Sequence, residues 1–288
     1  MANETGLDST GISTALPAWL RTKALEARYA SSKIWKHCYN AIEGDPLVSG
    51  QIKQKGDRVT LQIFPTLTAS NISTTDGSFT NTEISPTAVS VIINIWRNIS
   101  ADLVDIVDAQ AVLQWESEFA RAFGSAMGQD QDDQVLALVN NLTTNVDSSG
   151  GAFTDAKIRA AQLMLDNLNV PKEERTWGIS PGSHADLLSD SKWFAANTTG
   201  FSRGVQVGDG RVVGLYGTPV EVSTQITTTS TLRDNVLFHK EAFGVVMQRD
   251  FKMEKFARVR YSTNYAGSYL AGTATLRDNH AVWVTSAA

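Results

Sequence analysis

The chain has little cysteine, little charge and no long apolar run, and each shortage excludes a class of protein. Cys38 is the only cysteine among 288 residues, so no internal disulfide is expected. With four scattered histidines, it also excludes a zinc site built from cysteines. No stretch approaches the roughly 18 consecutive apolar residues that a membrane-spanning helix needs. The sequence therefore predicts no membrane partner.

Charge is scarce as well, and its sign argues against a dedicated nucleic-acid-binding protein. Charged residues make up 19% of the chain, against about 25% in an average domain. The net charge is −5, whereas proteins that grip nucleic acid usually carry a basic surplus. Serine and threonine take the place of charge, because 25 Ser and 28 Thr together nearly equal the 55 charged residues. Their hydroxyl groups supply hydrogen bonds without the desolvation cost of buried charge.

The first 16 residues are polar and predict a flexible arm, without the basic and apolar regions of a secretory signal. A short helix is expected after them, because Pro17 suits a first helical turn and apolar residues recur up to Trp35. Positions 19 to 40 carry one acidic residue and five basic ones: Glu26, Arg21, Lys23, Arg28, Lys33 and Lys36. Two interpretations of these charges stay open, a solvated face and a contact with a partner.

Two stretches of alternating apolar and polar residues, 59–63 and 89–95, predict strands on either side of a long polar loop. Residues 65–86 between them contain only two charged residues, Asp76 and Glu83, and too few apolar residues for a core of their own. A two-stranded arm is only marginally stable alone, and its open edges need cover. Another copy of the same chain is the simplest cover.

A helical period replaces this alternation from Asp102 to about Leu142, with Ser100 as N-cap. About forty residues make a rod of roughly 60 Å, which could break at Gly124 or Gly128. A rod this long must lie along a sheet or a neighbouring molecule. Its charge is lopsided, with one basic residue, Arg121, against the acidic residues Asp102, Asp105, Asp108, Glu116, Glu118, Asp130, Asp132 and Asp133.

The remaining sequence predicts a compact α/β region followed by a β-rich region. A helix is expected from Thr154 or Asp155 to Leu168, then a short buried strand at 177–179 and a second helix from Pro181. Residues 219–222 predict another strand. From residue 236 onward the pattern predicts mainly strands.

One motif suggests catalysis, because Gly178-Ile179-Ser180-Pro181-Gly182 fits the G-x-S-x-G of a nucleophile elbow. In such an elbow the residue after the serine donates its backbone N–H to the oxyanion, and proline has none. His239 and His280 lie downstream, but nothing in the sequence marks either one as the base. A serine N-cap on a helix that begins with proline explains the same residues without activity. No enzyme is therefore predicted.

Two further motifs are incomplete. Gly208-Asp209-Gly210 has part of a phosphate loop, but a strand-like stretch follows it in place of the helix that would hold a phosphate. Asp130, Asp132 and Asp133 suggest a calcium loop, but Val135 stands where that loop requires glycine, so a helical face is favoured. The sequence predicts no catalytic, cofactor-binding or metal site.

Five short motifs follow one another in a defined order. They are Gly56-Asp57-Arg58-Val59, Ile106-Val107-Asp108-Ala109-Gln110, Asn167 with Val170-Pro171 and Glu174-Arg175, Ile179-Ser180-Pro181 with Leu187-Leu188, and Gly214 and Gly217 with Val220-Glu221-Val222. In this order they resemble the major capsid proteins of tailed bacteriophages, which have the HK97 fold. The resemblance covers about residues 17 to 284.

The resemblance implies an α+β fold with the parts that this family shares. These are an N-terminal arm (1–45), an E-loop β-hairpin with flanking P-domain strands (46–98), the spine helix of the P-domain (99–145), an A-domain (146–235) and closing strands (236–288). It also implies a coat protein without cofactors, whose many copies form hexamers and pentamers of an icosahedral shell around double-stranded DNA, contacted non-specifically.

Scaffolding, portal and decoration proteins are further partners that the resemblance implies, and the location is the virion, assembled in the host bacterial cytoplasm. A cellular nanocompartment shell of the same fold is the alternative, and a serine hydrolase is a poorer one. Charges are expected to steer the subunits into register. The residues expected at subunit interfaces are Lys53, Lys55, Arg58, Phe64, Phe79, Glu83, Asp105, Asp108, Glu116, Glu118, Lys252, Lys255 and Arg258.

Overall fold

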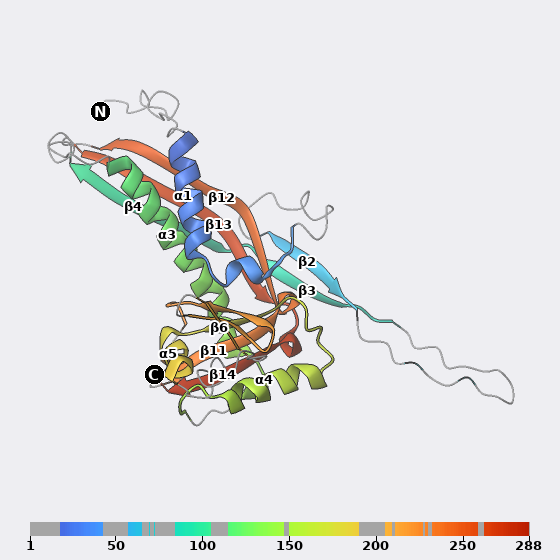
Figure 1. Ribbon diagram of the computed structural model, residues 1–288. Coiled ribbons are helices and arrows are strands. Elements are labelled where there is room, and N and C mark those ends of the chain that lie inside the picture. Colours follow the sequence, from blue (N-terminus) through green and yellow to red (C-terminus); the bar gives the residue numbers. More distant parts are fainter. Residues whose placement is uncertain are drawn as a thin grey trace.

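Two lobes and a projecting hairpin make up the described part of the chain (Figure 1). The structure is a computed structural model, and it describes residues 18–42, 57–64, 69, 72, 84–104, 115–146, 150–189, 205–208, 211–226, 228–229, 232–258 and 262–287. Within these ranges each lobe is built on its own sheet, and the hairpin forms a third sheet. The mixture of helices and sheets confirms the predicted α+β class.

The first lobe is a four-stranded sheet in the order β1-β12-β13-β4, with two helices packed against it (Figure 1). Strand β1 runs parallel to β12, and the other neighbours are antiparallel. Apolar side chains of the helices meet Tyr265 and Tyr269 of the sheet, and the Phe119 ring stacks on Tyr265 at a centroid distance of 5.5 Å. The elements are α1 (Ala18–Ser31), β1 (Tyr39–Asn40), β4 (Ile95–Val104), α3 (Trp115–Leu136), β12 (Phe243–Arg258) and β13 (Ser262–Thr275).

The long helix predicted from Asp102 to Leu142 is wrong at its beginning. Residues 95–104 form strand β4, so Ser100 lies in a strand and caps no helix, and the range 99–145 assigned to the spine helix starts with this strand. Helix α3 has 22 residues, about 33 Å at 1.5 Å per residue, and a 3-10 turn, η2 (Val139–Asn141), follows it. Residues 105–114 lie outside the described ranges. Ladder pairing with β13 along the whole of β4 overrides the local helical spacing.

Two glycines allow α1 and α3 to approach each other closely. Gly124 and Gly128 were the predicted places for a break, yet α3 continues through both. A Cβ atom at Gly124 would lie 2.0 Å from the carbonyl oxygen of Ala24, and one at Gly128 would lie 2.6 Å from that of Arg28. The glycines therefore remove side chains where the two helix backbones meet.

The second lobe is an eight-stranded sheet in the order β5-β14-β11-β6-β9-β8-β7, with β10 beside β11. Two helices cover a core that includes Phe153, Leu165, Trp177 and Leu187. The strands are β5 (Asn145–Val146), β6 (Arg175–Ile179), β7 (Val205–Gly208), β8 (Arg211–Leu215), β9 (Thr218–Val222), β10 (Thr228–Thr229), β11 (Leu232–His239) and β14 (Ala281–Ala287), and the helices are α4 (Asp155–Asn167) and α5 (Pro181–Ser189). These bounds confirm the strands predicted at 177–179 and 219–222 and both predicted helices. Gly208 ends the first strand of the β7–β8 hairpin, and β8 confirms the strand-like stretch predicted after residue 210.

The hairpin joins β2 (Arg58–Ile63) to β3 (Thr87–Ile92), and it points away from both lobes (Figure 1). The two strands are antiparallel, with Arg58 opposite Ile92 and Ile63 opposite Thr87. This confirms the strand predicted at 59–63, whereas the one predicted at 89–95 is divided, because β3 ends at Ile92 and Ile95 begins β4. Val59 and Val91 at its base pack against Val246 of β12. Most of the polar loop between the strands lies outside the described residues.

Several connections join the two lobes, and an apolar cluster fills the junction. Strand β11 continues through η3 (Lys240–Ala242) into β12, and β13 continues through η4 (Asp278–His280) into β14. The cluster includes Ile34, Cys38 and Phe243. Burial, with a smaller contribution from the nearby Asp132 charge, raises the pKa of the Cys38 thiol. Cys38 is thus an unreactive, buried small residue, as its sequence context predicts.

Candidate assembly surfaces

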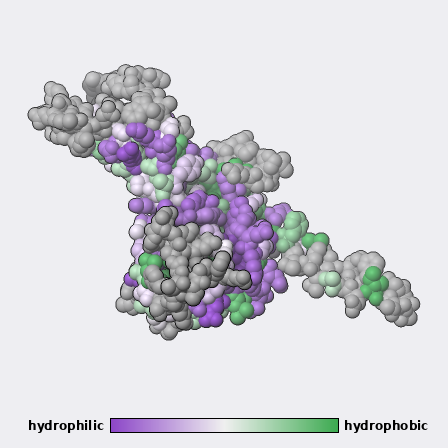
Figure 2. Space-filling view, in the orientation of Figure 1, coloured by the Kyte–Doolittle hydropathy of each residue, from purple (hydrophilic) through white to green (hydrophobic). Residues whose placement is uncertain are grey.

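The β2–β3 hairpin exposes large apolar side chains. Phe64 directly follows β2 and is 62% exposed, Ile92 at the end of β3 is 50% exposed, and Ile72 and Ile84 in the connecting segment are exposed as well. Figure 2 shows separate green patches on the hairpin, beside a mostly hydrophilic surface. Among the described strands, β2 and β3 pair only with each other. The hairpin therefore combines open strand edges with apolar side chains in water, which marks an interaction surface.

Strand β4 forms a second open edge. It is the last strand of the four-stranded sheet, and within the described part of the chain it pairs only with β13 along its ten residues. Trp96 on this strand is 60% exposed. The neighbouring Arg97 turns to α3, where its Nε lies 3.5 Å from a carboxylate oxygen of Asp130. A long edge strand with an exposed tryptophan is a template for a further strand or for an apolar contact.

The side chains of four predicted interface residues are described, and they belong to three parts of the fold: the hairpin, α3 and β12. Arg58 is exposed at the start of β2, and Phe64 directly follows the last residue of the same strand. Glu118 lies on α3 with a carboxylate oxygen 3.6 Å from Arg121, and Lys252 of β12 pairs with Glu254. Lys53, Lys55, Phe79, Glu83, Asp105 and Asp108 lie outside the described residues, and for Glu116, Lys255 and Arg258 only the backbone of α3 or β12 is described.

Asp132 on α3 has an internal role rather than an interface role. It is 1% exposed and accepts hydrogen bonds from the backbone N–H groups of Lys33 (2.7 Å), Ile34 (3.0 Å) and Trp35 (3.0 Å). Burial raises the pKa of this carboxyl, and the three hydrogen bonds offset part of that rise. The carboxylate ties α3 to the chain that follows α1. The predicted helical face at residues 130–133 is confirmed, because they lie within α3.

The basic residues near the N-terminus include two that bind within the chain. Arg28 is buried and forms an ion pair with Asp250 of β12. Lys36 Nζ lies 2.7 Å and His37 Nε2 lies 3.1 Å from the same carboxylate oxygen of Glu221. Burial acts to raise the pKa of Glu221, but hydrogen bonds from His37 and Lys36 and their charges lower it to about 2. The buried Arg28 therefore does not belong to a solvated face, whereas the Lys36 side chain is 41% exposed and both interpretations stay open for it.

Ser180 lies in a structural network. It is 3% exposed, and its hydroxyl oxygen accepts the N–H of Ser183 at 3.1 Å, which confirms the predicted N-cap of α5. The hydroxyl groups of Ser180, Ser183 and Ser286 form a chain of hydrogen bonds 2.9 and 2.8 Å long. The ring of His184 is engaged elsewhere, because its Nε2 accepts the N–H of Val212 at 3.1 Å. These contacts explain the motif as a helix cap.

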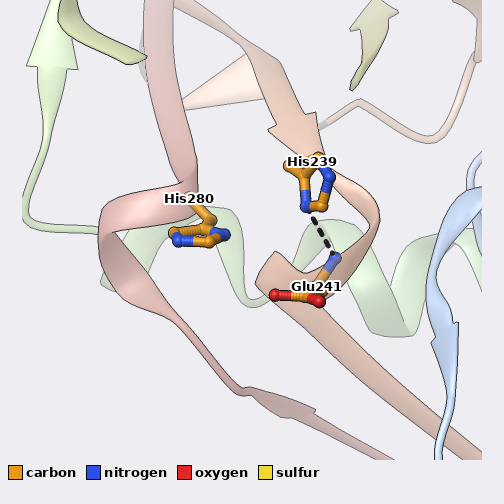
Figure 3. Close-up of side chains that lie close together, drawn as sticks. All are labelled: His239, Glu241 and His280. Carbon is orange, nitrogen blue, oxygen red and sulfur yellow. Dashed lines mark hydrogen bonds between the residues drawn. The ribbon is translucent and has the colours of Figure 1, made fainter. Parts of the chain in front are cut away.

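Sequence reasoning missed a cluster of His239, Glu241 and His280 at the junction of the lobes (Figure 3). The imidazole rings meet edge to face, with centroids 5.6 Å apart. Burial lowers the pKa of both histidines. The last pair of the β11–β14 ladder is Phe238 with Ala281, and the two histidines come next in register. Only that pairing reveals the cluster, and no local motif does.

The fold defines a class of protein: an HK97-like capsid subunit, with two lobes, a helix-backed sheet and a projecting hairpin. Solved structures support the class. The chain is similar to a structure described as Mycobacterium phage Che8, with 22% identity, 88% of this chain and 90% of that chain covered, and a TM-score of 0.70. The capsid of cyanophage P-SCSP1u is 18% identical, with 82% of this chain and 85% of that chain covered and a TM-score of 0.61. The SrpI encapsulin of Synechococcus elongatus PCC 7942 is 10% identical, with 78% of this chain and 81% of that chain covered and a TM-score of 0.50.

The sequence profile of the family described as "Phage capsid protein" matches residues 45–285. The chain therefore belongs to this phage capsid family and is a major capsid protein, a structural protein of the virion that assembles with many copies of itself. No curated protein matches the chain significantly. In the described ranges, none of the helices has the length and apolar character needed to cross a membrane.

Proposed function

We propose that this capsid protein forms an icosahedral shell of hexamers and pentamers that encloses double-stranded DNA. The net charge of −5 supports a container that contacts DNA non-specifically, because an interior that bound many phosphates would hinder packing and release. The proposal includes assembly in the host bacterial cytoplasm, with scaffolding, portal and decoration proteins, and no enzymatic activity. The four-stranded lobe corresponds to the P-domain, the eight-stranded lobe to the A-domain and the β2–β3 hairpin to the E-loop.

The exposed β2–β3 hairpin is the feature that supports this proposal most strongly. A two-stranded sheet standing alone is marginally stable. This one also leaves Phe64 and Ile92 at least half exposed, which water disfavours. Covering the hairpin with a neighbouring subunit satisfies its strand edges and its apolar side chains together. Stable assembly interfaces of this kind commonly bury more than about 2,000 Å².

Two double variants test the hairpin as an assembly surface. Phe64→Ser with Ile92→Ser removes exposed apolar area from the hairpin without opening a core cavity. Leu163→Ser with Leu168→Ser is the matched control, because both leucines are exposed apolar residues at helix α4. In negative-stain micrographs we expect closed particles from the unchanged chain and from the control, and small oligomers from the hairpin variant. Closed particles of normal diameter and yield from the hairpin variant would show that the hairpin is not an assembly surface.

A cellular nanocompartment is the second candidate, favoured by the similarity to an encapsulin. The same particles distinguish the two functions after nuclease treatment. A viral shell protects double-stranded DNA from the nuclease. A nanocompartment instead contains a second polypeptide with enzymatic activity and no protected DNA. We expect protected DNA, because the family match is to phage capsid proteins.

A further inference from the structure

The junction between the lobes holds a cluster of possible metal ligands that the shell function does not use. His239 ends β11, Glu241 lies in η3 and His280 ends η4, so the cluster sits on the two connections η3 and η4 that join the sheets. Each residue offers one ligand atom, and these atoms all lie within 4.8 Å of one another. In Figure 3 the ring of His280 approaches the other two residues from the opposite side.

One nitrogen of the cluster is buried without a hydrogen-bond partner among the described residues. It is Nδ1 of His280, a residue that is 8% exposed. Such a buried polar atom costs stability unless something occupies it. His239 is also buried, at 5% exposed, whereas the Glu241 side chain is 47% exposed and gives the cluster access to solvent. The site therefore has two fixed ligands inside and one movable ligand at its mouth.

We propose that His239, His280 and Glu241 bind one divalent transition-metal ion, with Zn²⁺ as the ion that fits best. Two imidazoles and a carboxylate are a ligand set that Zn²⁺ uses, with a fourth position left for water. Bonds of about 2.0–2.2 Å require ligand atoms about 3.4 Å apart in a tetrahedral site. The ligand atoms must therefore close from a spread of up to 4.8 Å, and the half-exposed Glu241 side chain can supply most of that movement.

Binding replaces two weak contacts. Nδ1 of His239 now accepts the N–H of Glu241 at 3.3 Å, and the Glu241 carboxylate lies 3.4 Å from Nε of Arg277. Both distances are long for hydrogen bonds, so little is lost when the metal takes their place. The bound ion would fasten η3 to η4 and hold the two lobes in one orientation.

Metal titration of the full-length chain tests the site. After treatment with a chelator and dialysis, we expect the unchanged chain to bind about one Zn²⁺ per chain and to bind Co²⁺ with a visible spectrum of nitrogen and oxygen ligands. Glu241→Gln should weaken Zn²⁺ binding at least about tenfold. Loss of a group that only hydrogen-bonds to a metal ligand already costs about that much, and Glu241 is a ligand itself. His280→Gln should abolish it. His37→Gln is the matched control, because His37 pairs with Glu221 outside the cluster, and it should bind normally.

Three outcomes overturn the proposal. The first is an unchanged chain that binds no Zn²⁺. The second is a Glu241→Gln variant that binds it as tightly as the unchanged chain, and this variant changes a half-exposed side chain, so it decides the matter even where His280→Gln fails to fold. The third is a His37→Gln variant that loses binding while the cluster variants keep it. In either of the last two cases the ion is held elsewhere.

Discussion

One buried carboxylate, that of Asp132, fixes the segment that follows α1 to helix α3. Asp132 accepts three consecutive backbone N–H groups, at residues 33 to 35, and a further hydrogen bond of 3.2 Å from the hydroxyl of Ser32. A carboxylate is suited to the position because hydrogen bonds to a charged acceptor are stronger than those between neutral groups.

Replacing Asp132 by alanine should therefore destabilise the fold strongly. Asp132→Ala leaves three N–H groups without their acceptor, and we expect a loss of about 3 kcal/mol in the free energy of unfolding. Asp133→Ala is the control, since Asp133 is exposed on the same helix, and it should change stability by less than about 0.5 kcal/mol. Urea-induced unfolding of the full-length variants measures both values. Equal stability of the two variants would contradict the capping role.

The sequence predicts which kind of element a residue lies in better than it predicts which residues it contacts. It places Asp130, Asp132 and Asp133 on a helix, as the structure confirms. It cannot show that Asp132 faces inward, because the three N–H groups that it accepts lie almost a hundred positions earlier. His239 and His280 pose the same difficulty. Their proximity depends on the pairing of β11 with β14, a tertiary feature that local pattern does not encode.

The packing of α1 against α3 depends on the absence of side chains. At Gly124 and Gly128 the backbone of α1 comes so near that any Cβ atom would overlap a carbonyl oxygen or its neighbours. Glycine lowers helix propensity by about 1 kcal/mol relative to alanine. Close contact between the helices offsets that cost here.

Gly124→Ala should consequently lower stability although it improves helix propensity. The new Cβ would lie 2.0 Å from a backbone oxygen of α1, which cannot rotate away as a side chain would. We expect a net loss of about 2 kcal/mol, the usual size of an overpacking penalty. Gln129→Ala, at an exposed position of the same helix, is the control and should leave the melting temperature unchanged. A higher melting temperature for Gly124→Ala would mean that the helices can separate freely.

Elements with a clear period are predictable from this sequence, and their ends are less so. Both hairpin strands, helices α4 and α5 and the late strands agree with their apolar patterns because burial of one face selects the same period. The segment around Asp102 fails, because its apolar residues satisfy helical spacing while its backbone completes a sheet. Long-range pairing with β13 outweighs local preference there.

Assembly into a shell requires the subunit to leave its extended parts uncovered until a neighbour arrives. The hairpin, the β4 edge and exposed Trp96 are costs for an isolated chain and contacts for an assembled one. Charge can guide these surfaces into register before apolar contact forms, since electrostatic attraction acts over about 10 Å at 0.1 M salt. Arg58 and Lys252 are the two basic residues of the predicted interface set whose exposed side chains lie in the described part of the chain.

Reversing these charges should impair assembly and leave the subunit folded. We expect Arg58→Glu and Lys252→Glu to slow particle formation at low salt, measured by light scattering, with normal circular dichroism and melting temperature. The defect should shrink as salt rises, because salt screens the repulsion that each reversed charge creates between two subunits. Arg159→Glu, an exposed arginine on α4, is the control for a simple change of net charge. Normal rates for both reversals would show that apolar contacts alone set the register, since a steering charge cannot be inverted without affecting the encounter of two subunits.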